Sequence, residues 1–315
     1  MKLPELRIGK LRPTLPIIQG GMAVRISTAS LAAAVANEGG IGLIAASGMT
    51  TGELKEEIRQ ARALTKGILG INVMYAVTAF ADLFKAAVQE GIDLVVSGAG
   101  FSRDMFTWGK EANVPVVPIV STVKLAQISE KLGALAVVVE GKEAGGHLGT
   151  ACPMQDLVPA VKQAVTIPVI AAGGIVEGKD IVRALRLGAN GVQIGTRFAA
   201  STESNAAPRL KEAYLQATEE DIVLVESPVG LPGRAIRNCF AEKIAAGKAP
   251  KPDVCNKCLK NCKGNFCIMK ALINAQKGNL EEGLIFAGEY VSKIKEILSV
   301  KEIVRRLLQE AEAAL

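Results

Sequence analysis

The sequence predicts an α/β protein, a (β/α)8 TIM barrel with a small, mostly helical cap inserted before its last helix. Three observations predict this fold. Eight short apolar runs are each followed by a segment with helical periodicity. The runs recur about every 20–30 residues, the spacing of a βα unit. Glycines or other small residues follow most of the runs, as expected where a backbone approaches a ligand closely.

The apolar runs read as parallel strands buried on both faces. The eight expected strands are Pro16–Gln19, Ile41–Ala45, Ile68–Val73, Leu94–Ser97, Val114–Val120, Leu135–Glu140, Pro168–Ala172 and Gly191–Gly195. Apolar residues at i, i+3 and i+4 predict helices between them, as over Ser27–Asn37, Thr51–Leu64, Ala79–Gln89, Thr122–Leu132 and Gly178–Leu187. A doubly wound open sheet is the alternative, but the first run is followed by Gln-Gly-Gly-Met-Ala instead of a GxGxxG turn.

The regular alternation stops after Phe198, which divides the chain. We expect residues 1–200 and 289–315 to form the barrel and residues 201–288 to form the cap. Within the second half, Ser201–Thr218 and Lys270–Gly288 are expected to be helical, the latter with turns. The long amphipathic segment Tyr290–Ala314 is expected to return as a helix and close the barrel.

A Pro/Gly-rich loop, Ser227–Gly233, precedes Arg234 and Arg237, which would share one helical face. The two arginines could guide an anion or pair with carboxylates. Lys248–Asp253 reads as a linker that leads to a group of cysteines.

Composition excludes several classes of function. The chain carries 37 Lys and Arg against 31 Asp and Glu, and the two signs alternate along its helices. With three Tyr and one Trp to stack on bases, this pattern argues against nucleic-acid binding and allows only a mild attraction for anionic substrates or an acidic carrier protein. No apolar run approaches 18 residues and the start lacks an apolar signal segment, so we expect a cytoplasmic protein that does not cross a membrane.

The stretch Glu140–Gly149, EGKEAGGHLG, follows the sixth expected strand and contains His147, the only histidine. An isolated GGH is more often an ordinary turn. Here, however, the carboxyl ends of parallel strands should meet at one rim, where barrel enzymes carry their chemistry. Gly173-Gly174 and Gly195-Thr196 follow the seventh and eighth strands, where barrels commonly bind a phosphate through backbone N–H groups.

These motifs resemble the FMN-dependent nitronate monooxygenases (2-nitropropane dioxygenases) and their relative, enoyl-acyl-carrier-protein reductase II. The matching segments are PIIQGGM at 16–22, GINVM at 70–74, SGAG at 97–100, EGKEAGGHLG at 140–149, IPVIAAGGI at 167–175 and GANGVQIGTRF at 188–198. They follow the family order and cover roughly residues 13–240.

The resemblance implies that FMN binds at the rim of the barrel. It places Gly21, Met22 and Asn72 along the flavin ring, Glu140, Gly145 and Gly146 toward the ribityl-phosphate side, and Gly173, Gly174, Gln193, Gly195 and Thr196 around the phosphate. It also implies that His147 is catalytic: in the monooxygenases the equivalent residue deprotonates a nitroalkane or binds the nitronate.

In the reductases, NAD(P)H reduces FMN, which then passes hydride to an enoyl thioester carried by acyl carrier protein. The monooxygenase class has a second histidine after strand four, where this chain has Ser97-Gly98-Ala99-Gly100, a pattern closer to the reductases. We therefore consider an FMN-dependent nitronate oxidation with O₂, an NAD(P)H-dependent enoyl thioester reduction, and a barrel that binds FMN without turnover. A homodimer formed through the cap is possible within any of them.

Cys255, Cys258, Cys262 and Cys267 lie within thirteen residues, with spacings of two, three and four. Four thiolates at such spacing could hold a zinc ion or an iron–sulfur cluster distant from His147, and the alternative is a set of reduced thiols. Cys152 and Cys239 are expected to be inert, buried thiols.

Overall fold

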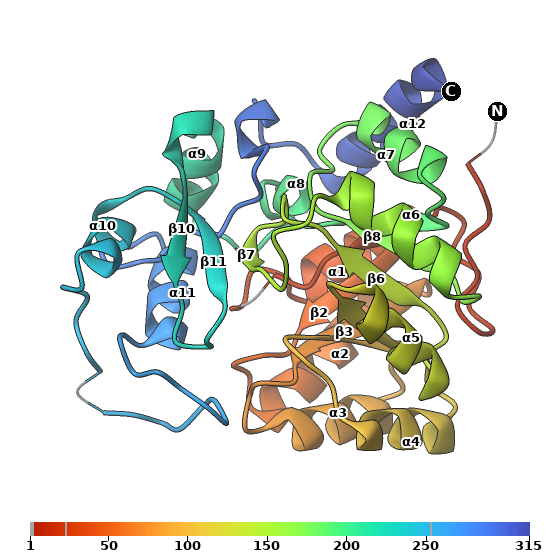
Figure 1. Ribbon diagram of the computed structural model, residues 1–315, viewed down its shortest axis with the longest axis horizontal. Coiled ribbons are helices and arrows are strands. Elements are labelled where there is room, and N and C mark those ends of the chain that lie inside the picture. Colours follow the sequence, from red (N-terminus) through yellow and green to blue (C-terminus); the bar gives the residue numbers. More distant parts are fainter. Residues whose placement is uncertain (1–2, 23, 253) are drawn as a thin grey trace.

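The computed structural model describes residues 3–22, 24–252 and 254–315. Eight parallel strands form a closed barrel, which confirms the predicted fold (Figure 1). The barrel strands are β1 (Ile17–Gln19), β2 (Ile41–Ala45), β3 (Ile68–Met74), β4 (Leu94–Gly98), β5 (Val116–Val120), β6 (Val137–Glu140), β8 (Val169–Ala172) and β9 (Gly191–Ile194). The first and last of these pair with each other through Ile18 and Gln193, which closes the barrel.

Helices surround the barrel in the order that the periodicity predicts. They are α1 (Ala29–Asn37), α2 (Thr51–Leu64), α3 (Phe80–Gln89), α4 (Arg103–Ala112), α5 (Val123–Lys131), α6 (Met154–Ala164), α7 (Gly178–Arg186) and the short α8 (Thr196–Ala199). Local chemistry fixes several of their ends. Helix α2, for instance, begins at a capping box in which Thr50 and Glu53 each satisfy the other's backbone N–H.

Side chains fill the barrel interior, so a ligand has room only at its rim. Ile18, Leu43, Val96 and Val138 point inward and are fully buried. Leu6, in the segment before β1, packs into the same apolar cluster. In parallel strands the carboxyl ends share one edge.

The register then places particular residues side by side at that edge. Glu140 pairs with Ala172, and Ala172 pairs with Gln193.

In the described part of residues 201–288, the segment predicted to form the cap, lie the α-helices α9 (Pro208–Gln216), α10 (Cys239–Ala245) and α11 (Ile268–Gln276) and the 3₁₀ helix η1 (Glu219–Asp221). The segment also contains a hairpin, β10 (Ile222–Glu226) and β11 (Pro232–Ile236), that the helical prediction missed. The hairpin extends to the two-residue strand β7 (Gly146–His147) in a separate three-stranded sheet. The prediction that Arg234 and Arg237 share a helical face is therefore wrong: Arg234 lies within β11 and Arg237 just after it.

The last helix is shorter than predicted. Helix α12 spans Val300–Ala314 and begins at Ser299, whose side chain accepts a hydrogen bond from the backbone N–H of Glu302. The preceding segment contains only one 3₁₀ turn, η2 (Val291–Lys293). As expected, α12 packs against α7 and α1 and so completes the outer ring of helices.

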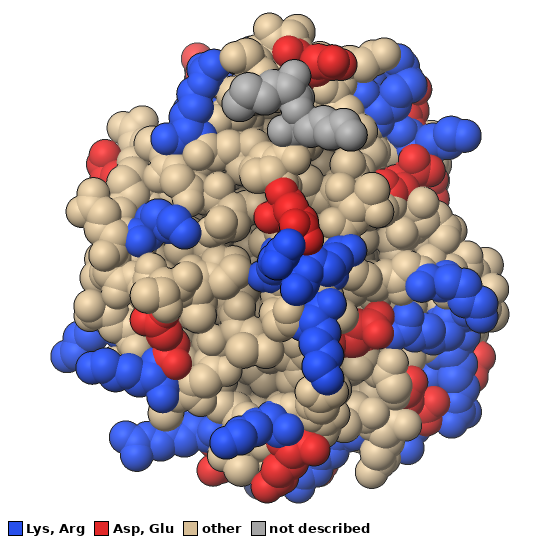
Figure 2. Space-filling model, turned by 90° about the vertical axis from the view of Figure 1, so that its right-hand side faces the viewer, with Lys and Arg blue, Asp and Glu red and all other residues tan. Residues whose placement is uncertain are grey.

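Charged side chains of both signs are interspersed on the face shown in Figure 2. Among the described residues, no helix combines the length and the apolarity needed to span a bilayer. The expected linker runs to Asp253, which lies outside the described residues, as do Met1 and Lys2.

Candidate active site

One cavity of about 240 Å³ opens between the rim of the barrel and the cap. The twelve residues predicted to bind cofactor or act in catalysis all line it: Gly21, Met22, Asn72, Glu140, Gly145, Gly146, His147, Gly173, Gly174, Gln193, Gly195 and Thr196. They come from the ends of five barrel strands and from the loop after β6, so the barrel brings together residues up to 175 positions apart. The predicted convergence at a single rim is therefore present; their roles remain proposals.

Two amide side chains in this cavity have buried oxygen atoms that accept no hydrogen bond from any of the described residues. Asn72 donates from Nδ2 to the carbonyl oxygen of Gly21 at 3.0 Å, but its Oδ1 accepts no hydrogen bond. Gln193 has a similarly unpartnered Oε1. A buried acceptor without a donor is costly, so both atoms indicate a ligand that brings N–H or O–H groups.

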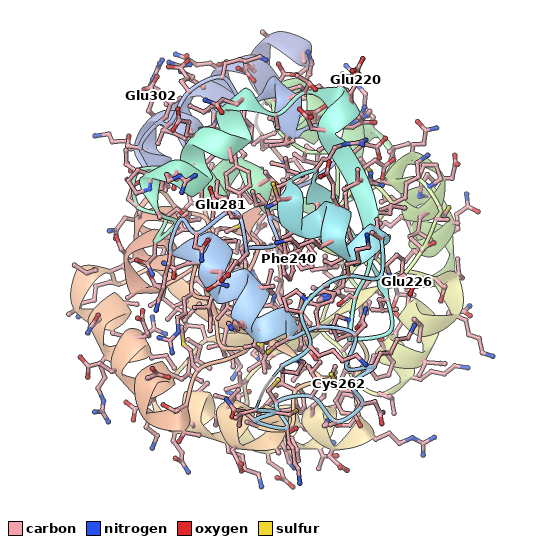
Figure 3. The ribbon with its side chains drawn as sticks, turned by 90° about the vertical axis from the view of Figure 1, so that its left-hand side faces the viewer. Glu220, Glu226, Phe240, Cys262, Glu281 and Glu302 are labelled. Atoms are coloured by element: carbon pink, nitrogen blue, oxygen red, sulfur yellow. The ribbon has the colours of Figure 1, made fainter. Side chains whose placement is uncertain are left out.

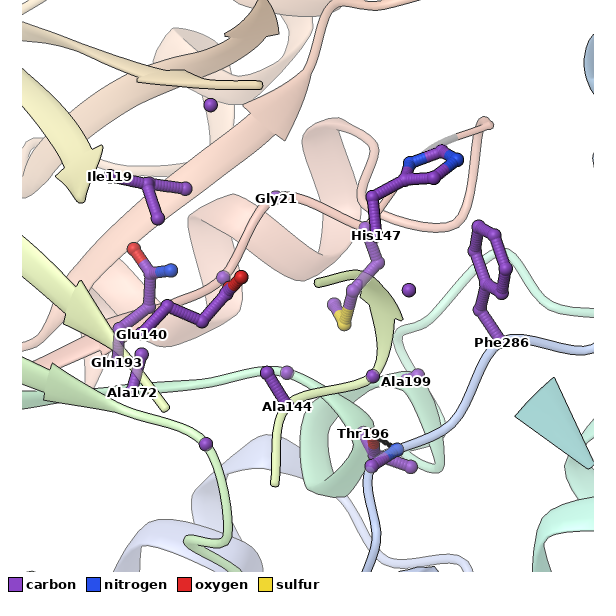
Figure 4. Close-up of a pocket in the computed structure, with 18 of the residues that line it drawn as sticks. Gly21, Ile119, Glu140, Ala144, His147, Ala172, Gln193, Thr196, Ala199 and Phe286 are labelled. Atoms are coloured by element: carbon purple, nitrogen blue, oxygen red, sulfur yellow. Dashed lines mark hydrogen bonds between the residues drawn. The ribbon is translucent and has the colours of Figure 1, made fainter. Parts of the chain in front are cut away.

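The side chain of Glu140 also points into the cavity, beside Gln193 (Figure 4). Burial away from water raises the pKa of Glu140 to about 8. The carboxyl group is therefore largely protonated at neutral pH in the ligand-free protein, and it can donate a hydrogen bond as well as accept one.

Glycines let the backbone form the cavity wall. Gly173 and Gly174 adopt φ values of 98° and 69°, which other residues rarely adopt. A Cβ on Gly145 would lie 2.5 Å from the backbone of Ala287, so a side chain there would push the cap segment away. Thr196 also holds the cap segment that contains Ala287 and Gly288, since its Oγ1 accepts the backbone N–H of Gly288 at 2.9 Å.

His147 faces the cavity from β7, and residues of the cap hold its ring. Its Nε2 lies 2.7 Å from Oγ of Ser227, and its ring packs edge-on to Phe286 with 5.1 Å between centroids. Burial lowers the pKa of His147 to about 4, because the charged imidazolium loses its hydration. The imidazole is thus neutral at physiological pH.

Two charged residues shape the loop that carries His147. Arg234 donates from Nη2 to the carbonyl of Lys142 at 2.7 Å and from Nε to that of Ala144 at 3.1 Å. It also lies 3.4 Å from the carboxylate of Glu289. Glu143 is buried and accepts the backbone N–H of Met154 at 3.0 Å. Of the two roles considered for Arg234, the structure shows pairing with a carboxylate.

The cap and the segment that directly follows it supply an apolar side of the cavity that sequence reasoning missed. It consists of Tyr214, Leu272, Phe286, Tyr290 and Val291. These residues lie 65 or more positions after His147 in segments without a motif, so nothing local in the sequence marks them. The sequence places Ser227 in a Pro/Gly-rich loop but gives no sign of its contact with His147.

The predicted metal site at the four clustered cysteines is not supported. Within residues 3–22, 24–252 and 254–315, no three His, Cys, Asp or Glu side chains are grouped so that they could hold a metal ion. All four are free thiols, and Cys255 and Cys262 are exposed. Figure 3 shows Cys262 in the loop segment that precedes α11. Burial and the three neighbouring cysteines raise the pKa of Cys258, which favours its protonated thiol.

The cysteine segment is instead fixed to the barrel by its backbone. Thr78, after β3, donates its N–H to the carbonyl of Cys258 at 2.9 Å, and Lys260 donates to the carbonyl of Ala76 at 2.9 Å. Lys260 also places its ammonium group 3.5 Å from the ring centroid of Tyr75. The other two cysteines were both expected to be buried. Cys152 is only partly buried, and the prediction for Cys239 is wrong because Cys239 is exposed.

Comparison with known proteins agrees with this geometry. A family model described as nitronate monooxygenase matches residues 5–310. A probable nitronate monooxygenase of Staphylococcus aureus (strain JH9) is 33% identical over 283 residues, which cover 76% of this chain and 79% of that protein.

Two solved structures are similar over nearly the whole chain. FabK from Thermotoga maritima has a TM-score of 0.88 and 35% identity, covering 96% of this chain and 94% of its own. A nitroalkane oxidase from Streptomyces ansochromogenes has a TM-score of 0.83 and 26% identity, covering 96% and 97%. The chain belongs to the nitronate monooxygenase family and is an oxidoreductase.

Proposed function

We propose that this protein is an FMN-dependent oxidoreductase that oxidises alkyl nitronates with O₂, with His147 in contact with the substrate. The observation that carries the proposal is the single cavity in which His147 meets the glycine-lined rim of the barrel. FMN is the cofactor of the family. Bound there, it would supply the redox chemistry that none of the cavity's side chains provides.

The residues present fit such a cofactor. The unpartnered Oδ1 of Asn72 and Oε1 of Gln193 suit the ring N–H or the ribityl hydroxyls of a flavin. Gly21 lets Asn72 pack directly against the tip of the first strand, since any Cβ there would overlap the Asn72 side chain. Backbone N–H groups around Gly174 and Gly195 are proposed to receive the phosphate.

His147 and the cap complete the site on the substrate side. The neutral imidazole packs edge-on against Phe286, and both residues line the cavity. Apolar side chains of the cap exclude water from the space over the rim, which strengthens every hydrogen bond to a substrate anion there.

A second candidate is the NAD(P)H-dependent reduction of an enoyl thioester carried by acyl carrier protein. Two observations favour it: the likeness to FabK, an enoyl-ACP reductase, and the apolar side of the cavity, which suits an acyl chain. Ile26 and Ala199 extend the apolar lining of the cavity on the barrel side.

Anaerobic reduction of the FMN-loaded protein separates the two functions. We expect an alkyl nitronate to bleach the flavin absorbance rapidly and NADH or NADPH to bleach it hardly at all. Rapid bleaching by NADH or NADPH, followed by recovery on addition of an enoyl thioester, would replace the first function with the second. Bleaching by neither would leave a barrel that binds FMN without turnover.

A further inference from the structure

The hydrogen bond between His147 and Ser227 links the catalytic histidine to the turn of the cap hairpin. Ser227 is 1% exposed and directly follows strand β10, at the start of the turn. Its Oγ lies 2.7 Å from Nε2 of His147 and also accepts the backbone N–H of Val229 at 3.3 Å. In the 2.7 Å hydrogen bond, either the Ser227 hydroxyl or Nε2 of His147 could be the donor.

Counting protons decides the direction. A serine hydroxyl has one proton and two lone pairs, and the N–H of Val229 already occupies one lone pair. In the part of the chain that the structure describes, Nε2 of His147 is the one acceptor within reach of the hydroxyl proton. If Nε2 carried a proton and donated it, the buried hydroxyl proton of Ser227 would have no acceptor, which is unfavourable for a buried donor.

The hydroxyl of Ser227 therefore donates to Nε2. The imidazole is neutral, since burial holds the pKa of His147 near 4, and a neutral imidazole has a single N–H. That proton must then lie on Nδ1, which has no partner among the described hydrogen bonds.

We infer that Ser227 fixes His147 in the tautomer protonated on Nδ1, so that His147 offers the substrate a hydrogen-bond donor and not a base. Its acceptor would be a substrate oxygen that carries negative charge: a nitronate oxygen, or the carbonyl oxygen of a thioester as it becomes an enolate. The inference rests on the proposed function for its substrate, but the tautomer itself does not. Ser227 is then a positioning residue that acts through His147.

The single histidine makes the tautomer directly measurable. In FMN-free protein labelled with ¹⁵N-histidine, every imidazole ¹⁵N signal comes from His147. We expect Nδ1 at the shift of a protonated ring nitrogen and Nε2 at that of an unprotonated one. The reverse pattern in the parent protein would overturn the inference without recourse to any variant.

Variants then test whether Ser227 is the cause. Ser227→Ala should move both ¹⁵N signals toward the Nε2-protonated form, and Ser227→Thr, which keeps the hydroxyl, should restore them. Ser204→Ala removes another buried cap hydroxyl, one that accepts from Ala206 at 3.3 Å, and should leave both signals unchanged. Signals that are unchanged in Ser227→Ala would contradict the role of Ser227.

Kinetics test the consequence for catalysis. In FMN-loaded protein, Ser227→Ala should lower kcat roughly ten- to a hundredfold while FMN affinity stays within about twofold, since Ser227 does not line the cavity. An unchanged kcat would contradict the donor role. Parent protein with the expected ¹⁵N pattern but without turnover of nitronate or thioester would overturn the proposed function and leave the tautomer assignment intact.

Discussion

Asn72 holds the tip of the first barrel strand by donating a 3.0 Å hydrogen bond from Nδ2 to the carbonyl oxygen of Gly21. The two residues are 51 positions apart and meet because β1 and β3 end at the same rim. The contact is so close that any side chain at position 21 would overlap that of Asn72. The cavity wall at this point therefore depends on a glycine.

Gly21→Ala should consequently lower FMN affinity by at least about tenfold, because Asn72 must move to make room, and such overpacking costs about 1–3 kcal/mol. Titration of FMN-free protein by flavin fluorescence measures this. Gly52→Ala is the control, since a Cβ there meets nothing within 4 Å, and it should bind FMN as the parent does. Equal affinity in both variants would show that the first strand tip does not contact the cofactor.

Gln193→Met should separate cofactor binding from stability. It removes the unpartnered Oε1, so the FMN-free protein should be as stable as the parent or more so in urea unfolding. Flavin affinity should fall roughly ten- to a hundredfold, since a ligand hydrogen bond is lost. Gln60→Met, at an exposed position on α2, should change neither. If Gln193→Met binds FMN as tightly as the parent does, Oε1 of Gln193 does not contact the flavin.

Glu140 should make the FMN-free protein less stable as pH rises. Its pKa is about 8 when folded, well above its ordinary value, so between about pH 4.5 and 8 the folded state holds a proton that the unfolded state has released. The free energy of unfolding should fall across that window by up to about 1.4 kcal/mol per pH unit from this residue.

Glu140→Gln removes this titration, so its stability advantage over the parent should grow from pH 5 to pH 8. Urea unfolding at several pH values measures the difference. The exposed Glu56→Gln should show no such trend. A difference that stays constant with pH would mean that Glu140 is ionised in the folded protein.

Substitutions of Arg234 and Arg237 should differ in their effect on FMN affinity. Arg234→Met removes the hydrogen bonds to Lys142 and Ala144 that shape the glycine loop, and should lower FMN affinity roughly tenfold. Arg237→Met changes an exposed side chain whose one hydrogen bond among the described residues goes to the carbonyl of Glu220 at 3.3 Å. It should leave affinity within about twofold. Equal losses would indicate a general effect on the cap.

The barrel and its rim could be predicted because their signals are local. Each strand is a short apolar run, and the glycines after it serve close backbone approach wherever the chain later places them. The hairpin was missed because β11 has the sequence Pro-Gly-Arg-Ala-Ile, which lacks strand character and is held by pairing with β10 and β7.

Long-range packing explains the remaining errors. Residues 290–298 keep helical periodicity, but beyond the 3₁₀ turn η2 the carbonyl of Glu296 accepts from Arg197 and Leu298 bridges to Ser201. These contacts keep residues 294–298 out of a helix, and α12 begins only after its cap, Ser299. Cysteine spacing shows which thiols are neighbours in sequence, and it does not show whether their sulfur atoms converge. The contact between His147 and Ser227 spans 80 positions and has no sequence signal.

The central claim is that the cavity under His147 holds one FMN. Its most direct test is to denature the purified, FMN-saturated and desalted protein, identify the flavin released and measure its amount per chain. We predict FMN close to one equivalent, reduced to well under half an equivalent in Gly21→Ala. A parent protein that retains no flavin after saturation, or that retains as much in Gly21→Ala as in the parent, would contradict the account.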